Sequence, residues 1–315
     1  MSFESDLLID RRRLKRRLLF WRALAVLAVL VVLLLGVGVA GRTAGFGGPL
    51  GGAYVARLDV GGLIGENHDL DEAVAKLASD SRARALLIRV DSPGGTVSGG
   101  ESLHDAIAKV AAKKPVVVVM GGTAASAAYM ISAPASRIFA HDSTLTGSIG
   151  VLLETGEVSG LLDKLGIRAE TIVSGPLKNQ PSLTAPISPA GQEVLQALVM
   201  DMYDQFVAIV ASGRHMDPAR VRELADGRAY TGRQALALGL VDAIGGEDEA
   251  RAWLASAKGV PTGLPTRKVT TETGAMSRVF GALGPPWGSL LKSVFGQGVI
   301  LDGAWAVWQP GLHGG

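Results

Sequence analysis

The sequence predicts an α/β fold built on a mostly parallel sheet. Three short apolar runs bounded by Gly or Pro indicate buried strands at Tyr54–Val60, Ala85–Val90 and Pro115–Met120. Between them, Leu70–Leu77 and Leu103–Val110 have the apolar spacing of helices. Strands that alternate with helices in this way are typical of βαβ units, whose strands run parallel.

Four more helices are expected farther along the chain. A long amphipathic one covers Pro189–Val210, and shorter ones cover Pro218–Ala225, Arg233–Leu238 and Asp248–Ala257, the last ending at Gly259. Residues 260–315 are rich in Gly, Pro and Trp and show no clear periodicity except around Trp287–Phe295. We therefore expect a folded domain at 53–258 and a C-terminal extension of undefined structure at 259–315.

The N-terminal segment predicts one transmembrane helix at residues 23–41. Ala23–Ala40 is an uninterrupted run of 18 apolar or glycine residues, close to the ~20 that span a bilayer as a helix. Seven Lys or Arg residues lie in the basic tail, residues 1–22, against three acids. The positive-inside rule then places the N-terminus in the cytoplasm and the domain outside it. A cleaved signal peptide is the alternative, although this run exceeds the usual ~7–15 apolar residues.

Composition narrows the class of protein further. The glycine-rich stretch at 42–52 is expected to be a flexible linker. Beyond residue 22 the chain has 24 basic and 26 acidic residues, so nucleic-acid binding gains no support. The chain has no cysteine, and its five histidines are not spaced as metal ligands. We expect no metal and no other cofactor, with the histidines structural, including His141 beside Asp142.

Three sequence features supply the parts of a nucleophilic site. Ser126 lies in the small-residue stretch Gly121–Met130, and Lys178 follows it by 178 − 126 = 52 residues. Asp91–Gly95 is expected to be a turn after one strand, and Ser126 follows the next, so both should meet at one sheet edge. A lysine can deprotonate a serine if it is desolvated and neutral. The backbone amides of Gly95 and Ala127 would then form the oxyanion hole.

These features, in this order, resemble the signal peptide peptidase A family, the S49 serine/lysine membrane proteases of the Clp protease and crotonase superfamily. The resemblance covers roughly residues 53–258. Its motifs are Asp91–Gly95, Ala124–Ser126 with Tyr129, Thr146–Val151, the distant lysine, Tyr230–Ala235 and Gly239–Asp242. It implies a Clp protease/crotonase-like fold of repeated ββα/βαβ units preceded by one transmembrane helix. It also implies that Ser148 holds the amine of Lys178.

Two departures from the family pattern stand out. Ala127 and Ala128 follow the serine where family members usually have Gly-Gly, and we expect their methyl groups to add bulk where substrate backbone approaches. Pro176 and Leu177 precede the lysine where an aromatic residue is usual, which bears on the shape of that loop.

The resemblance implies a serine endopeptidase that cleaves released signal peptides and other apolar or misfolded segments through an acyl-enzyme. It would reside in the bacterial inner membrane as a single-pass protein, with its domain outside the cytoplasm. A homo-oligomeric ring is implied, an octamer being one option, in which neighbouring subunits complete the sites. Two alternatives stay open, namely a crotonase-type acyl-CoA hydratase or isomerase and an inactive membrane-tethered scaffold.

Overall fold

The computed structural model describes residue 21, residues 52–270 and residues 305–307. The predicted transmembrane helix lies outside the described residues, as do the stretch around 287–295, nearly all of the basic tail and all of the linker except Gly52. The predicted domain boundaries therefore stay predictions.

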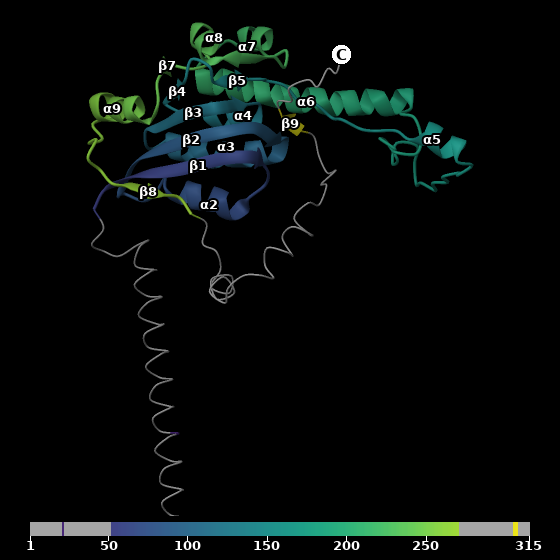
Figure 1. The fold of residues 1–315 in the computed structure, drawn as a ribbon, viewed down its shortest axis with the longest axis horizontal. Helices are drawn as coiled ribbons and strands as arrows, with labels where there is room; N and C mark the ends of the chain where they lie inside the picture. The colour runs from purple at the N-terminus through teal and green to yellow at the C-terminus, as the bar shows by residue number, and fades with distance from the viewer. Residues whose placement is uncertain (1–20, 22–51, 271–304, 308–315) are drawn as a thin grey trace, which may run out of the picture. The chain divides into compact units, whose positions relative to one another are not determined.

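The described residues contain a nine-stranded sheet with the central order β6-β5-β3-β2-β1-β8 (Figure 1). The strands are β1 (Tyr54–Ile64), β2 (Ala83–Thr96), β3 (Val116–Ala125), β4 (Arg137–Ala140), β5 (Leu145–Gly147), β6 (Ala229–Thr231), β7 (Ala243–Ile244), β8 (Thr266–Lys268) and β9 (Trp305–Val307). Pairing of β1 with β2 and of β2 with β3 is parallel. The predicted parallel α/β fold is confirmed.

The helices of the described residues are α2 (His68–Lys76), α3 (Val97–Ala111), α4 (Ala127–Ser132), α5 (Ser159–Lys164), α6 (Pro189–Arg214), α7 (Pro218–Leu224), α8 (Gly232–Ala237) and α9 (Glu247–Lys258). All except α4 and α5 lie where the apolar spacing predicts them, with ends that differ by a few residues. Gly259 ends α9 in the left-handed conformation, as its sequence position suggested. The largest difference is at α3, which begins six residues before the predicted start because the side chain of Thr96 caps it.

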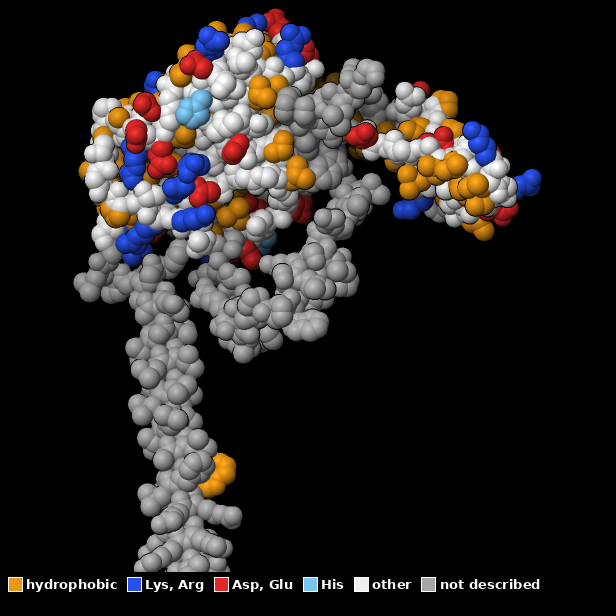
Figure 2. Space-filling view, in the orientation of Figure 1, with side chains coloured by type: hydrophobic (Ala, Val, Ile, Leu, Met, Phe, Trp, Pro, Cys, Tyr) orange, Lys and Arg blue, Asp and Glu red, His pale blue; other side chains and the backbone are white. Residues whose placement is uncertain are grey.

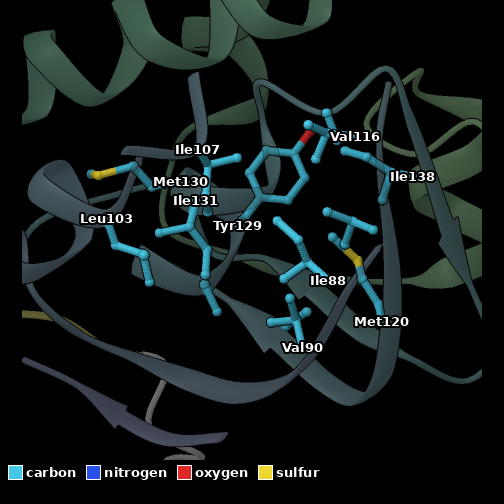
Figure 3. Close-up of a cluster of buried hydrophobic side chains, with 14 of the residues drawn as sticks. Ile88, Val90, Leu103, Ile107, Val116, Met120, Tyr129, Met130, Ile131 and Ile138 are labelled. Carbon is cyan, nitrogen blue, oxygen red and sulfur yellow. The ribbon is translucent and has the colours of Figure 1, made fainter. Parts of the chain in front are cut away.

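Both faces of the sheet are buried, as expected for parallel strands covered by helices. Leu86 and Ile88 of β2 belong to the larger core cluster, which includes residues of α2, α3, α4 and α6. Figure 3 shows the part of this cluster around Tyr129. Leu87 belongs to a smaller cluster on the other face, where Leu254 of α9 packs. Adjacent residues of one strand therefore face opposite layers.

The expected turn at Asp91–Gly95 is wrong, because β2 continues through it to Thr96. β1 also continues beyond its predicted end, and Leu63 and Ile64 pair with Gly94 and Gly95. The strands come so close that a Cβ on Gly95 would lie 1.8 Å from the carbonyl oxygen of Ile64. Only glycine fits there. The register shift between Val90 and Ser92 marks where the regular pairing of β2 with β3 ends.

Two strands lie in the region where the sequence shows no periodicity. β8 pairs with the start of β1, and β9 pairs antiparallel with the end of β2. Each has three residues, which is too short for an alternating apolar pattern to be seen.

Among the described residues, α6 is the one helix whose length and composition would allow it to cross a membrane. Phe206, Val207 and Val210 in its second half are buried in the larger core cluster. Val194 and Leu198 in its first half are exposed. Its second half therefore serves as a core helix of the domain.

Candidate active site

Ser126 occupies a sharp junction between β3 and α4. Its backbone has φ 57° and ψ −121°, a left-handed conformation that non-glycine residues adopt at a cost of ~1–3 kcal/mol. The surrounding main chain holds it there. The Ser126 amide donates to the carbonyl of Gly147 at 2.8 Å, and its own carbonyl accepts from the amides of Tyr129 and Met130. Strained strand-to-helix turns of this kind present nucleophilic serines in other hydrolases.

The hydroxyl of Ser126 is buried and unpartnered. Of the buried side-chain polar atoms among the described residues, Ser126 Oγ and Arg137 Nε are the two that lack a hydrogen-bond partner. Leaving a buried hydroxyl unpaired costs ~1–3 kcal/mol, and such groups are rare unless they have a task. The strain and the missing partner thus occur at the same residue.

Ser148, which the family resemblance implies as a member of the site, follows β5 at the level where Ser126 follows β3. Ala125 pairs with Gly147 across β3 and β5, so the next residue of each strand is a serine. Ser148 is also left-handed, with φ 48°, and its amide donates to the carbonyl of Arg228 at 2.9 Å. Its side chain is nearly buried, with 6% of its surface exposed. The two hydroxyl-bearing residues are therefore fixed by one strand pair.

Gly95 and Ala127 lie at the starts of two helices that pack together. Gly95 precedes α3, Ala127 opens α4, and a Cβ added to Gly100 of α3 would lie 3.0 Å from the Cβ of Ala127. Ala127 and Ala128 are fully buried in the larger core cluster. Our expectation that their methyl groups add bulk on the substrate side is therefore wrong, since these methyl groups fill core space beneath the helix.

Ser92 fixes the backbone ahead of Gly95, a role that sequence reasoning missed. It is fully buried, and its hydroxyl donates to the carbonyl of Gly62 at 2.6 Å and accepts from the amide of Gly94 at 3.1 Å. One side chain thus ties the end of β1 to the end of β2. The only signal in the sequence is its place within Asp91–Gly95.

Tyr129 anchors α4 to the Gly239–Asp242 motif. The Tyr129 hydroxyl donates to the carbonyl of Leu240 at 2.8 Å, and its ring is fully buried (Figure 3). Burial raises the pKa of Tyr129, so the phenol stays protonated and keeps this bond. Asp242 accepts hydrogen bonds from the Ile138 amide and from Arg214. The residues of the Gly239–Asp242 motif therefore brace the sheet and α4.

Lys178 makes no hydrogen bond with the hydroxyl of Ser126 in the single chain. It is exposed and lies in a turn, where its amide donates to the carbonyl of Gly175 at 3.1 Å. It belongs to residues 152–188, which we call the arm. In Figure 1 the part of the arm that carries α5 extends away from the sheet, whereas α4 packs against the sheet. The hydroxyl of Ser126 accordingly has no partner from the arm.

The arm exposes many large apolar side chains, and Figure 2 shows them gathered around α5. They are Leu152, Val158, Leu161, Leu165, Ile167, Ile172, Val173, Leu177, Leu183 and Ile187. Ile172 has its full surface exposed (101%). Apolar surface on this scale marks a site for contact with another molecule.

Comparison with known proteins places this arrangement in a family. The model for peptidase family S49 matches residues 108–261, and the model for Clp protease matches residues 67–145. A Synechocystis protein named as a protease, slr0021, is 40% identical over 221 residues, which cover 70% of this chain and 78% of that protein.

Other relatives are longer than this chain. The protein named signal peptide peptidase SppA from Enterococcus faecium is 43% identical, and the match covers 56% of this chain and 51% of that protein. Protease 4 of Salmonella typhi is 40% identical, with 54% of this chain and 28% of that protein covered. A solved structure of a ClpP1 mutant from Listeria monocytogenes is 20% identical, covers 62% of this chain and 92% of its own, and has a TM-score of 0.41. Because the chain covers most of the Synechocystis relative and carries the family match around Ser126, it belongs to peptidase family S49 and is a serine peptidase.

Proposed function

We propose that this chain is a membrane-anchored endopeptidase in which Ser126 is the nucleophile and Lys178 the general base. The observation that carries the proposal is the strained, buried and unpartnered Ser126 at the start of α4. Its hydroxyl attacks the peptide carbonyl, and its proton passes to the neutral amine of Lys178. The amides of Gly95 and Ala127 stabilise the oxyanion that forms. The C–N bond then breaks, and the proton returns from Lys178 to the leaving amine.

Water completes the reaction by hydrolysing the ester on Ser126. In this proposal the hydroxyl of Ser148 forms a hydrogen bond with the amine of Lys178 and keeps that amine in line with Ser126. This role is supported by its position directly after β5, whose last residue Gly147 pairs with the residue that precedes Ser126. No metal or other cofactor enters any step.

We further propose that Lys178 reaches Ser126 from a neighbouring subunit. The lysine lies on the exposed arm, and the serine of the same chain has no partner. An arm that packs on the next subunit would bury its apolar side chains and desolvate Lys178, which favours the neutral amine. A closed ring of such head-to-tail contacts satisfies every subunit. The match to the Clp protease model supports an oligomeric assembly.

The substrates proposed are released signal peptides and other apolar or misfolded segments. The name of the Enterococcus faecium relative supports the signal peptides among these substrates. Residues 23–41 would anchor the protein in the bacterial inner membrane, with the arginine-rich tail in the cytoplasm and the domain outside. A reporter enzyme that is active only outside the cytoplasm should be active when it is fused after residue 52. Activity at this position of a reporter that works only in the cytoplasm would refute the orientation.

The decisive experiment tests the two catalytic residues singly and in mixed oligomers. Ser126→Ala and Lys178→Arg should each lower peptidase kcat/KM by at least about 10³-fold, because one removes the nucleophile and the other substitutes a cation that keeps its proton. Lys164→Ala, which removes another lysine of the arm, should leave hydrolysis unchanged. A fluorophosphonate should label the wild type and fail to label Ser126→Ala.

Coexpression of Ser126→Ala with Lys178→Arg then tests where the base comes from. If each site combines residues of two subunits, random mixing restores about one quarter of the sites, since each half of a site is intact half of the time. If both residues act within one chain, the mixture has no activity. Hydrolysis that survives Ser126→Ala would refute Ser126 as the nucleophile, whereas a wild-type protein that hydrolyses no peptide would favour the inactive-scaffold alternative.

A further inference from the structure

The edge of the sheet at which the parallel strands begin is rich in cations that have no acidic partner. β1, β2, β3 and β4 pair in parallel and so begin at one edge, whereas Ser126 follows the end of β3 at the opposite edge. The beginning of β1 lies at the left of the sheet in Figure 1. We call six cations at the strand starts and helix ends of this side the basic edge, namely Arg84, Lys109, Lys113, Lys114, Arg137 and Lys258. No ion pair joins any of them to a carboxylate of the described residues.

Asp80 lies at the same edge but does not neutralise this group. Its carboxylate is paired with Arg82, whose Nε lies 3.2 Å from Oδ1. The amine of Lys114 donates to the backbone carbonyl of Asp80 and not to the carboxylate. Burial lowers the pKa of Lys114; Asp80 opposes this effect, and the charges of Arg84 and Lys113 add to it. Self-repulsion of this kind destabilises a fold unless a partner of opposite charge offsets it.

Arg137 and Lys258 contact an aromatic ring instead of a carboxylate. The last turn of α9 returns to this edge because β8, which follows it, runs parallel to β1. Arg137 and Lys258 lie over the ring of Trp253, 5.7 Å and 5.6 Å from its centroid. The face of a ring attracts a cation but carries no net charge that could cancel it. Both positive charges are therefore held in place and stay uncompensated.

Helix dipoles explain only part of the basic edge. Lysines in the last turn of a helix complement its negative end, which accounts for Lys109 and Lys258. The dipole does not account for Arg84 and Arg137, which lie within the first two residues of β2 and β4. The first turn of α9, at its other end, carries three acidic residues. Charge is thus segregated along this helix, with the positive end at the basic edge.

The chain enters the described fold at this same edge. β1 begins at Tyr54, and the predicted transmembrane helix ends at residue 41, which is 54 − 41 = 13 residues earlier. Thirteen residues span at most ~45 Å. An anionic lipid surface attracts Lys and Arg within about one Debye length, ~8–10 Å. The length of the connection therefore keeps the basic edge within reach of the lipid headgroups.

We propose that the basic edge docks on an anionic lipid surface and so sets the orientation of the domain on the membrane. This rests on the transmembrane anchor of the proposed function. Opposite charge supplies the attraction, and the entry of the chain at this edge supplies the proximity. The edge that carries Ser126 is then turned away from the headgroups and receives peptides that have left the bilayer.

Fluorescence energy transfer in the full chain measures this docking. The chain has no cysteine, so one introduced cysteine carries one coumarin donor. Ser81→Cys labels the basic edge and Ser143→Cys labels the opposite edge, and both positions are exposed. The labelled chain is reconstituted into vesicles that carry rhodamine-phosphatidylethanolamine as the acceptor in both leaflets. Transfer is compared between vesicles of phosphatidylcholine alone and vesicles of phosphatidylcholine and phosphatidylglycerol in equal parts.

The anionic vesicles should raise the transfer from Ser81→Cys and leave the transfer from Ser143→Cys low. The test variant combines Arg84→Gln, Lys109→Gln and Lys113→Gln, all at exposed positions. Each Lys or Arg near an anionic surface favours the docked state about fivefold, so the loss of three should lower the docking equilibrium about 100-fold. On anionic vesicles this variant should therefore show the transfer that the wild type shows on neutral ones.

The matched control removes three exposed cations beside β6, at the other end of the sheet. It combines Arg220→Gln, Arg222→Gln and Arg233→Gln and should keep the transfer of the wild type. An equal loss in both triple variants would overturn the proposal, because net charge alone would then decide the result. NaCl at ~1 M, where the Debye length is ~3 Å, should abolish the gain in the wild type. A gain that persists at this salt would overturn the proposal without any need for a variant to fold.

Two other results would also overturn it. One is equal transfer from Ser81→Cys on both kinds of vesicle. The other is an equal gain from both labels, because the domain would then adsorb without a fixed orientation. Flotation with neutral vesicles reports the anchor separately, and a chain that does not float would refute the anchor and this proposal with it. Hydrolysis enters neither measurement, so a failure of the peptidase mechanism would be seen independently.

Discussion

Replacing Ser126 with alanine should stabilise the protein while it abolishes hydrolysis. The hydroxyl is buried and has no hydrogen-bond partner, so its removal relieves a desolvation penalty of ~1–3 kcal/mol and breaks no bond. The strained backbone at φ 57° remains, because alanine also carries a Cβ. For the single chain, in which no neighbouring subunit supplies Lys178, we expect a net gain of about 1 kcal/mol in the free energy of unfolding. Ser126→Gly also relieves ~1–3 kcal/mol of strain and should be at least as stable.

Ser132 provides the matched control in the same helix. It is also fully buried, but its hydroxyl donates to the carbonyl of Ala128 at 2.7 Å. Ser132→Ala should therefore lower the free energy of unfolding by ~0.5–1.5 kcal/mol. Thermal unfolding followed by tryptophan fluorescence, at equal protein concentrations, resolves both changes, since 1 kcal/mol shifts Tm by ~2–4 °C for a domain of this size. A lower Tm for Ser126→Ala, similar to that of Ser132→Ala, would refute the claim that the Ser126 hydroxyl has no hydrogen-bond partner.

Two further perturbations test the frame of the site. Gly147→Ala should reduce activity and lower the free energy of unfolding by at least ~2 kcal/mol, because a Cβ there would lie 2.7 Å from the ring of Tyr230. Gly166 has a similar positive φ with open space around it, so Gly166→Ala should lower the free energy of unfolding by only ~1 kcal/mol. Equal losses in Tm would refute the steric argument. Burial alone would raise the pKa of Asp80, but hydrogen bonds from Arg82 and Tyr54 outweigh it and lower that pKa to about 2. The carboxylate therefore adds ~2 kcal/mol to the free energy of unfolding above pH ~4, and this contribution is lost as the pH falls through about 2. Acid titration of Asp80→Asn should not show this loss.

The parallel sheet could be predicted from sequence because its central strands are local apolar runs. Tyr54–Val60 and Ala85–Val90 carry enough buried side chains to be recognised without their partners. The extension of β2 through Asp91–Gly95 could not be predicted, since Asp, Pro and Gly disfavour strands. That extension depends on pairing with Ile64 and its neighbours, which is tertiary information.

The candidate site could likewise be predicted from the sequence only in part. Sequence motifs predict Ser126 and Ser148 as site residues, and both directly follow the paired residues Ala125 and Gly147. No local pattern predicts the left-handed backbone of Ser126, because one of the hydrogen bonds that hold it, from its amide to the carbonyl of Gly147, joins residues far apart in the sequence. The role of Lys178 stays a prediction, since its arm is exposed in the single chain and the partner it would need is another subunit.

The frame around Ser126 is made of main chain, and this has a consequence for how the site can change over evolution. The carbonyls of Gly147 and Arg228 hold the backbone at the two serines, and neither contact depends on the side chain of residue 127 or 128. Substitutions at such positions can drift with the packing beneath the helix while the nucleophile stays in place. Ala127 and Ala128, where the family resemblance led us to expect Gly-Gly, would then be a change in core packing that leaves the reactive geometry alone. A search for active members of this family should accordingly weigh strand register above the identity of the residues that follow the serine.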